Sequence, residues 1–136
     1  MSDEPRGSAF DTGLFGQAGG FAVRIMDLSG GNGADPVETI RGFRTLEHAN
    51  AFARRYVRDS LERCRTGGMT PEEVIAAWFA FGEDAEVLGG KDDAWRSAAE
   101  LNDFARRPVM DAEERNWRIL DPRRDEADAD EEDEEP

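Results

Sequence analysis

Residues 70–81 constrain the fold of this chain more than any other segment. Thr70-Pro-Glu-Glu73 combines a capping box with a proline at the first helical position, so a helix is predicted to begin there. Its large apolar side chains cover an arc of about 200°, where an ordinary surface helix shows a narrower stripe. We therefore expect burial on two sides, by the protein's own core or by another subunit, with Trp78 as a candidate partner-binding residue. The apolar residues are Val74, Ile75, Trp78, Phe79 and Phe81.

A longer amphipathic helix is predicted just before this one, over about residues 46–66. Thr45 is a suitable N-cap, and Gly67 and Gly68 end the helical pattern. One side of the helix is apolar, because large and small apolar residues recur at spacings of three and four. These residues are Leu46, Ala49, Phe52, Ala53, Tyr56, Val57, Leu61 and Cys64.

Three arginines, Arg54, Arg58 and Arg65, fall together on the opposite side of this helix and are called the arginine stripe below. The sequence leaves two interpretations open. The stripe is a basic docking strip for an acidic partner or for the protein's own tail, or it is a solvated face. A solvated face would carry ion pairs at spacing four, such as Arg58 with Glu62, each worth a few tenths of a kcal/mol.

Two strands are predicted before the helices. Residues 21–28 place Phe21, Val23 and Ile25 on one face at period two, which is typical of a half-buried strand. Residues 29–36 have the composition of a turn, and residues 37–43 resume a strand-like composition, so an antiparallel hairpin is predicted. Residues 83–90 form either a third, edge strand or a loop.

A third helix is predicted from Asp93 until shortly before Pro108, and one or two further turns around Trp117 and Ile119. Together these elements predict an α+β fold. A small antiparallel sheet of two or three strands would pack against two or three helices. The predicted domain spans residues 21–120.

The two ends of the chain have the composition of disordered segments. Residues 1–20 hold few large apolar groups and are predicted to form a flexible arm. Residues 121–136 carry ten acidic and two basic side chains, which is more than half of the formal charge of −14. This acidic tail is predicted to stay extended, because it repels itself and cannot bury apolar surface.

Charge and composition exclude several function classes. An acidic chain repels phosphate backbones and anionic lipids, so direct nucleic-acid and membrane binding are not expected. No segment has the length of apolar residues that crosses a bilayer, and the first residues lack the features of a signal peptide, so a cytoplasmic location is expected. One cysteine and one histidine supply neither an internal disulfide nor a zinc site.

No catalytic or cofactor-binding pattern is found. Cys64 and His48 lie sixteen residues apart on one predicted helix, about 24 Å along its axis, so they cannot act as nucleophile and base within one chain. The glycine-rich residues 29–33 lack the Lys-Ser or Lys-Thr of a phosphate-binding loop. Adjacent acidic pairs such as Glu72-Glu73 are explained by their positions at helix starts. We expect no enzyme activity, no cofactor and no metal.

Two segments carry a resemblance to a known family. These are Gly42-Phe-Arg-Thr-Leu-Glu-His-Ala-Asn-Ala-Phe-Ala-Arg-Arg55, and Gly68-Met-Thr-Pro-Glu-Glu-Val74 leading to Phe81-Gly-Glu-Asp84. They resemble a family of uncharacterised small bacterial proteins in which a strand pair leads into a "TLEEA" helix. The resemblance covers about residues 21–107 and implies the order strand, strand, helix, helix. The family has no assigned activity, so it implies no function, and Ala85-Glu86 departs from its pattern.

The exclusions leave a binding role as the expected function. We expect a small bacterial protein-interaction module, with a protein partner or a second copy of the chain as its ligand. The alternative is an acidic nucleic-acid mimic that inhibits a DNA- or RNA-binding protein. A mimic needs carboxylates fixed on a rigid surface, whereas more than half of the negative charge lies in residues 121–136.

Overall fold

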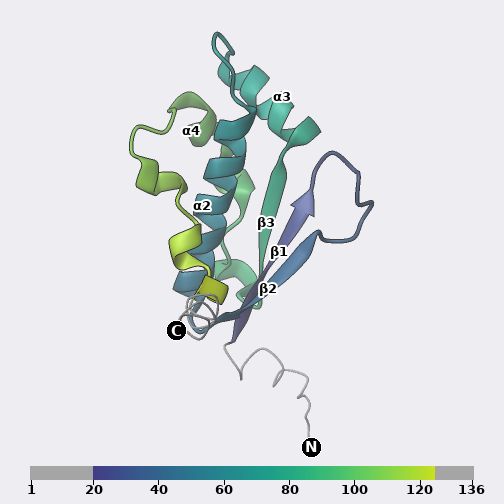
Figure 1. Cartoon of the computed structure of the whole chain (residues 1–136), viewed down its shortest axis with the longest axis vertical. Helices are drawn as coiled ribbons and strands as arrows, with labels where there is room; N and C mark the ends of the chain where they lie inside the picture. Colours follow the sequence, from purple (N-terminus) through teal and green to yellow (C-terminus); the bar gives the residue numbers. More distant parts are fainter. Residues whose placement is uncertain (1–19, 125–136) are drawn as a thin grey trace, which may run out of the picture.

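The computed structural model describes residues 20–124, and the predicted arm before Gly20 and the tail after residue 124 lie outside the described residues. Three strands form one antiparallel sheet in the order β2-β1-β3 (Figure 1). They are β1 (Phe21–Asp27), β2 (Glu38–Phe43) and β3 (Glu83–Leu88). The predicted hairpin is confirmed, and residues 83–88 form an edge strand rather than a loop. The fold is α+β, as the sequence predicts.

The strand register explains which face of the sheet is buried. Val23 on the central strand β1 lies opposite Ile40 on β2 and Val87 on β3, while Ile25 lies opposite Ala85. Because side chains alternate between the faces of a sheet, these residues share the face that packs against the helices. Val23, Ile25 and Ile40 are fully buried there.

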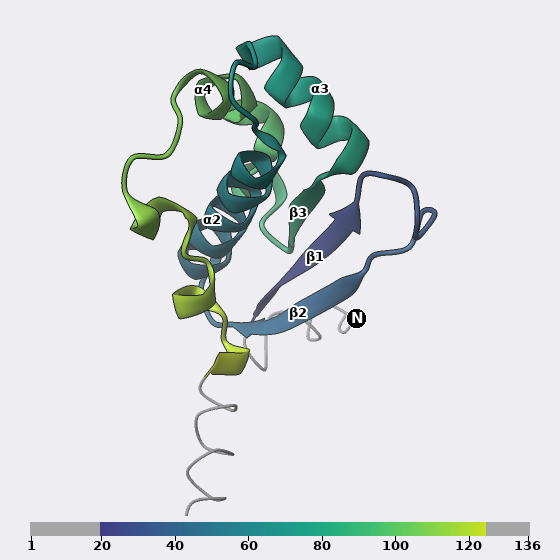
Figure 2. The ribbon, with the colours of Figure 1, turned by 45° about the horizontal axis from the view of Figure 1, so that its top comes forward.

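Two long helices follow the hairpin with the caps that the sequence predicts. In α2 (Leu46–Cys64) the Thr45 hydroxyl accepts a hydrogen bond from the His48 N–H at 3.0 Å. In α3 (Pro71–Phe81) both hydrogen bonds of the Thr70 and Glu73 capping box are present. Figure 2 shows α2 lying across one face of the sheet, with α3 and the short helix α4 near its C-terminal end.

The predicted third helix is shorter than expected. Asp93 does not cap it, because the chain from Ala94 to Arg96 is extended, and α4 spans only Leu101–Arg106. The reason is a tertiary contact. The Asn50 side chain on α2 donates to the Asp93 carbonyl at 3.1 Å and accepts from the Trp95 N–H at 2.8 Å. This contact interrupts the helical pattern, so the segment before α4 forms two 3-10 turns, Lys91–Asp93 and Ser97–Ala99, with extended backbone between them.

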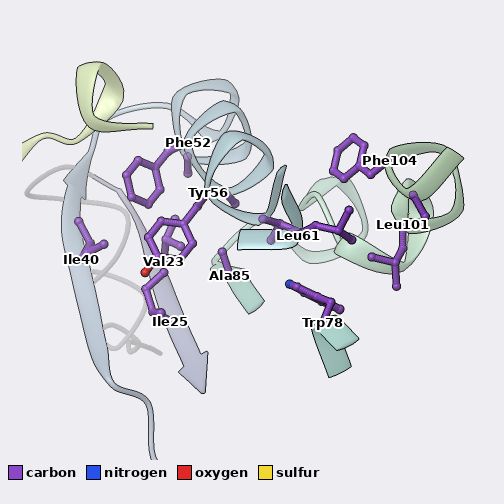
Figure 3. Close-up of a cluster of buried hydrophobic side chains, with 14 of the residues drawn as sticks. Val23, Ile25, Ile40, Phe52, Tyr56, Leu61, Trp78, Ala85, Leu101 and Phe104 are labelled. Carbon is purple, nitrogen blue, oxygen red and sulfur yellow. The ribbon is translucent and has the colours of Figure 1, made fainter. Parts of the chain in front are cut away.

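The hydrophobic core lies between the sheet, α2, α3 and α4. Figure 3 shows that it contains side chains from all of these elements, with Trp78 of α3 in the same cluster as Leu61, Leu101 and Phe104. The core residues with the largest fully buried side chains are Trp78, Phe43, Phe52, Phe104, Ile25, Ile40, Leu61, Val23, Val57 and Val74.

Residues 111–124, called the C-terminal strap below, lie against α2 and β2. The predicted further turns are two 3-10 turns, Ala112–Arg115 and Arg118–Leu120. Trp117 packs against Phe52 and Tyr56, and its Nε1 donates to the buried Asp59 carboxylate at 3.2 Å. Arg123, within the predicted acidic tail, donates to Glu38 of β2 at 2.8 Å. Residues 121–124 therefore contact the folded domain.

Candidate functional site

The arginine stripe does not form an exposed surface. Arg58 is buried, and its guanidinium donates to the carbonyl oxygens of Phe104 at 3.0 Å and Arg107 at 2.6 Å. Arg65 donates to the carbonyl oxygen of Ala105 at 3.0 Å. These carbonyl oxygens lie at the end of α4, where no N–H group of the helix is available as a hydrogen-bond donor. The stripe holds α4 against α2, so both the docking strip and the solvated face are wrong for Arg58 and Arg65.

Arg54 is the exposed member of the stripe. It forms an ion pair with Glu100 just before α4, and its guanidinium lies 5.2 Å from the centre of the Phe104 ring. Arg58 also departs from the predicted pairing, because its nearest carboxylate is Glu114 on the C-terminal strap, at 3.4 Å, rather than Glu62. Helical periodicity identified the face correctly but could not show that α4 covers it.

Trp78 is a core residue and not a contact for a partner. Its side chain is 1% exposed and packs within the hydrophobic core. The adjacent Gly82 leaves room for the indole, since a Cβ at Gly82 would lie 2.8 Å from both Trp78 Nε1 and the Trp78 carbonyl oxygen. The prediction that Trp78 binds a partner is therefore corrected, while the prediction that it is buried is confirmed.

The exposed aromatic side chains of α3 are Phe79 and Phe81. Phe79 is 55% exposed and Phe81 is 76% exposed, although residues 74–81 contain no charged side chain. Ala76 and Ala80 are exposed on the same helix. Ala76, Phe79 and Ala80 share one side of the helix, which we call the α3 face, whereas Phe81 projects about 160° away from Phe79 around the helix axis. The sequence predicts that α3 is buried on two sides, but the described residues bury only one side of this helix.

A groove of about 530 Å³ lies beside Phe81, around the helix from the α3 face. Its apolar lining comes from Cys64 at the end of α2, Met69 in the following turn, and Ala77 and Phe81 on α3. The start of β3 and the end of β1 complete it. Its charged lining residues are Asp27, Arg63 and Glu83. The groove and the α3 face together form the candidate functional site.

Hydrogen bonds fix the polar side of the groove. The Tyr56 hydroxyl donates to Glu83 Oε1 at 2.6 Å, and the Glu83 N–H donates to Ser60 Oγ at 2.8 Å. Burial raises the pKa of Tyr56, and the Glu83 carboxylate raises it further, so the phenol stays a neutral donor. Arg63 lies between two acids, 3.5 Å from Asp59 and 4.0 Å from Glu83.

Cys64 and His48 do not form a catalytic pair. Burial raises the pKa of the Cys64 thiol, which keeps it protonated and weakly nucleophilic. His48 lies at the other end of α2, where its Nε2 donates to the Leu120 carbonyl oxygen at 2.7 Å. Within residues 20–124, no group of three or more His, Cys, Asp or Glu side chains could hold a metal ion.

A second, more polar pocket of about 420 Å³ lies along β3, between this strand and the segment around Trp95. Arg24 and Glu86 pair across it at 2.6 Å. Burial raises the pKa of Asp84, although hydrogen bonds from Ser97 and the Ala85 N–H act in the opposite direction. Arg24 and Glu86 neutralise one another, and the Asp84 carboxylate already accepts hydrogen bonds from the domain, which makes this pocket a weaker candidate for ligand binding than the groove.

The candidate site was only partly indicated by the sequence. The apolar arc of α3 indicated a second partner for this helix, but did not distinguish its buried centre at Trp78 from its exposed edges at Phe79 and Phe81. Comparisons with protein-family models, curated proteins and solved structures found no match. The resemblance to small bacterial proteins stays a prediction. No helix in the described part of the chain is long and apolar enough to span a membrane.

Proposed function

We propose that this chain is a small protein-interaction module that contacts its partner through the α3 face and the groove beside Phe81. One observation carries the proposal: an uncharged apolar helix segment leaves Phe79 and Phe81 largely exposed, and Phe81 lines a groove. Exposed apolar patches on soluble proteins commonly mark interaction sites, and aromatic anchors dominate the energetics of interfaces. A non-enzymatic role and a cytoplasmic location are part of this proposal.

Other exposed apolar residues do not offer a comparable surface. Val37 lies beside β2, while Met110 and Ile119 lie near and within the C-terminal strap. Single exposed apolar side chains are normal on protein surfaces and need no partner. Only α3 combines two exposed aromatic rings with a groove among the residues that the structure describes.

The ion pairs of the domain favour this function over nucleic-acid mimicry. A mimic presents rows of unpaired carboxylates to a basic groove. Many acids of the described domain are instead neutralised by arginines. The pairs include Glu100 with Arg54, Asp103 with Arg107, Glu86 with Arg24, and both Asp121 and Glu38 with Arg123.

The test is a cross-linked pull-down from an extract of the native cells, using the full chain and a Phe79→Ser/Phe81→Ser variant. Met110→Ser is the matched control, because Met110 is 90% exposed and distant in sequence from α3. Both variants should keep the free energy of unfolding within about 1 kcal/mol of the original, since exposed side chains contribute little to stability.

We expect a protein that is captured by the original chain and by Met110→Ser but is lost with the double variant. A partner that the double variant retains in full would place the contact surface elsewhere and contradict the proposal.

A further inference from the structure

We infer that the free edge of β3 binds an extended, acidic segment of another protein as a fourth strand of the sheet. The binding site is the pocket along β3, in which the charged side chains are mostly paired but the backbone of the strand is not. This pocket shares no lining residue with the groove beside Phe81. The inference therefore goes beyond the proposed function and does not depend on it.

The strand register shows which backbone groups of β3 point away from β1. The Leu28 N–H donates to the Gly82 carbonyl oxygen at 2.9 Å, so every second residue from Gly82 onwards is bonded to β1. The intervening residues, Glu83, Ala85 and Val87, direct their N–H and carbonyl groups the other way. Because β3 is an edge strand, these groups face the free edge of the sheet.

The edge is only partly satisfied within the domain. The Glu83 N–H donates to Ser60 Oγ at 2.8 Å, and the Ala85 N–H donates to Asp84 Oδ1 at 2.9 Å. Within residues 20–124, the Val87 N–H and the carbonyl oxygens of Ala85 and Val87 have no protein partner. An antiparallel peptide can exchange two hydrogen bonds with Val87 and donate a third to Ala85, which is recognition by strand addition.

The pocket provides space beside this edge. All residues from Asp84 to Leu88 line it, although successive side chains of a strand point to opposite faces, so the pocket follows the backbone. One strand residue occupies about 160 Å³, given a rise of about 3.3 Å, a strand spacing of about 4.8 Å and a sheet spacing of about 10 Å. The volume of about 420 Å³ therefore corresponds to about two or three peptide residues.

Two side chains on the opposite wall define the chemistry of the ligand. Arg96 is exposed and forms no ion pair within residues 20–124, whereas Arg24 of the same pocket is paired with Glu86. The half-buried Trp95 ring is stacked on Phe104, with centroids 6.4 Å apart, and its position in the pocket wall offers an apolar surface. A peptide with a carboxylate for Arg96 and an apolar side chain for Trp95 matches both.

Two other occupants are disfavoured. Pairing of two β3 strands would bring Asp84 and Glu86 of both copies together, in chains that each carry a formal charge of −14. Residues 1–19 join the domain at Gly20, whose carbonyl oxygen lies close to Gly89 after β3. However, four of the eight residues 13–20 are glycine, which weakens a strand.

The probe is the synthetic peptide Thr-Val-Thr-Glu-Thr-Val-Thr with blocked termini, and its control has Lys in place of Glu. Binding to the full chain is measured by fluorescence anisotropy at several salt concentrations. Amide hydrogen exchange of Val87, followed by nuclear magnetic resonance, reports whether the edge is occupied. We expect the Glu peptide, but not the Lys peptide, to bind and to slow this exchange by roughly tenfold, because the N–H becomes a donor within the sheet.

Arg96→Gln should weaken binding of the Glu peptide by roughly threefold to tenfold and flatten its salt dependence, because salt screens exposed charges. Arg106→Gln is the matched control. Arg106 is an exposed arginine of α4 that forms no ion pair in the described part of the chain, so its replacement should leave the affinity unchanged.

Val87→Pro removes the free N–H without removing a hydrogen bond to β1, and proline is tolerated at such edge positions. Val87→Ala is its control, because it also shortens the side chain but keeps the N–H. The proline variant should bind the Glu peptide at least about fivefold more weakly than the alanine variant. If the proline variant fails to fold, the Val87 exchange and the Arg96→Gln affinity decide.

Four results would overturn the inference. The first is equal binding of the Glu and Lys peptides, and the second is binding that leaves the exchange of the Val87 amide unchanged. The third is a concentration-dependent dimer that Val87→Pro abolishes, which would assign the edge to a second copy. The fourth is binding of the Glu peptide only after residues 1–19 are deleted, which would assign the edge to those residues.

Discussion

Arg58 Nη1 donates a hydrogen bond of 3.0 Å to the carbonyl oxygen of Phe104, and its guanidinium lies 4.6 Å from the centre of the Phe104 ring. A single side chain of α2 thus donates to a carbonyl oxygen at the end of α4 and also stacks on Phe104, the largest residue of that helix. Around Arg58, the side of α2 opposite the sheet is therefore buried against α4.

Arg58→Met should destabilise the protein by about 2 to 4 kcal/mol, because it leaves the carbonyl oxygen of Arg107 without its donor, removes one of the two arginine donors to the carbonyl oxygen of Phe104, and deletes a buried charge-assisted contact. Methionine keeps the length and the helix propensity of the side chain. Arg54→Met is the control, since this exposed ion pair should contribute less than about 1 kcal/mol. Urea unfolding measures both changes, and equal effects of the two would contradict the structural role of Arg58.

Gly82→Ala should cost about 1 to 3 kcal/mol. The added Cβ would lie 2.8 Å from the backbone carbonyl oxygen of Trp78 and against the buried indole, so the backbone or the core must shift. Gly67→Ala is the matched control, because nothing lies within 4 Å of a Cβ there. Thermal unfolding of the two variants should differ clearly. A Gly82→Ala protein as stable as the control would show that the core around Trp78 is loosely packed.

Asp84→Asn should stabilise the protein at neutral pH. Burial raises the pKa of Asp84, so the folded state penalises the ionised carboxylate at any pH well above that raised value. Asparagine removes the charge and keeps an oxygen for the Ala85 N–H. The gain should disappear as the pH falls and Asp84 becomes protonated. Urea unfolding across this pH range tests the sign, and a variant that is less stable at neutral pH would contradict it.

Local sequence signals predicted the elements whose boundaries depend on local contacts. The capping box at Thr70, the cap at Thr45 and the alternation in residues 21–25 each involve neighbours in the chain, so their geometry follows from spacing alone. The segment after β3 depends on distant contacts. Asn50 binds the backbone of Asp93 and Trp95 on either side of the extended Ala94, and no periodicity in that segment could reveal it.

The candidate site was predictable only in outline. The wide apolar arc on α3 indicated that this helix contacts a partner in addition to the core. Only the position of the helix in the fold shows that Trp78 is buried and that Phe79 is exposed. For the arginine stripe the error was the opposite one, because a face that α4 covers was predicted to be exposed. Its side of α2 is polar by composition, yet Phe104 and the carbonyls of α4 cover it. An arginine side chain can be buried where its donors find carbonyl oxygens.

Photo-cross-linking in the native cell tests the interaction surface most directly. A benzoylphenylalanine in place of Phe79 puts the reactive group on the α3 face, and the same residue in place of Met110 provides an exposed control. We predict a discrete cross-linked protein with the Phe79 probe that the Met110 probe does not yield. The same products from both positions, or none from Phe79 while the Met110 probe captures a specific protein, would contradict the assignment of α3 as the binding surface.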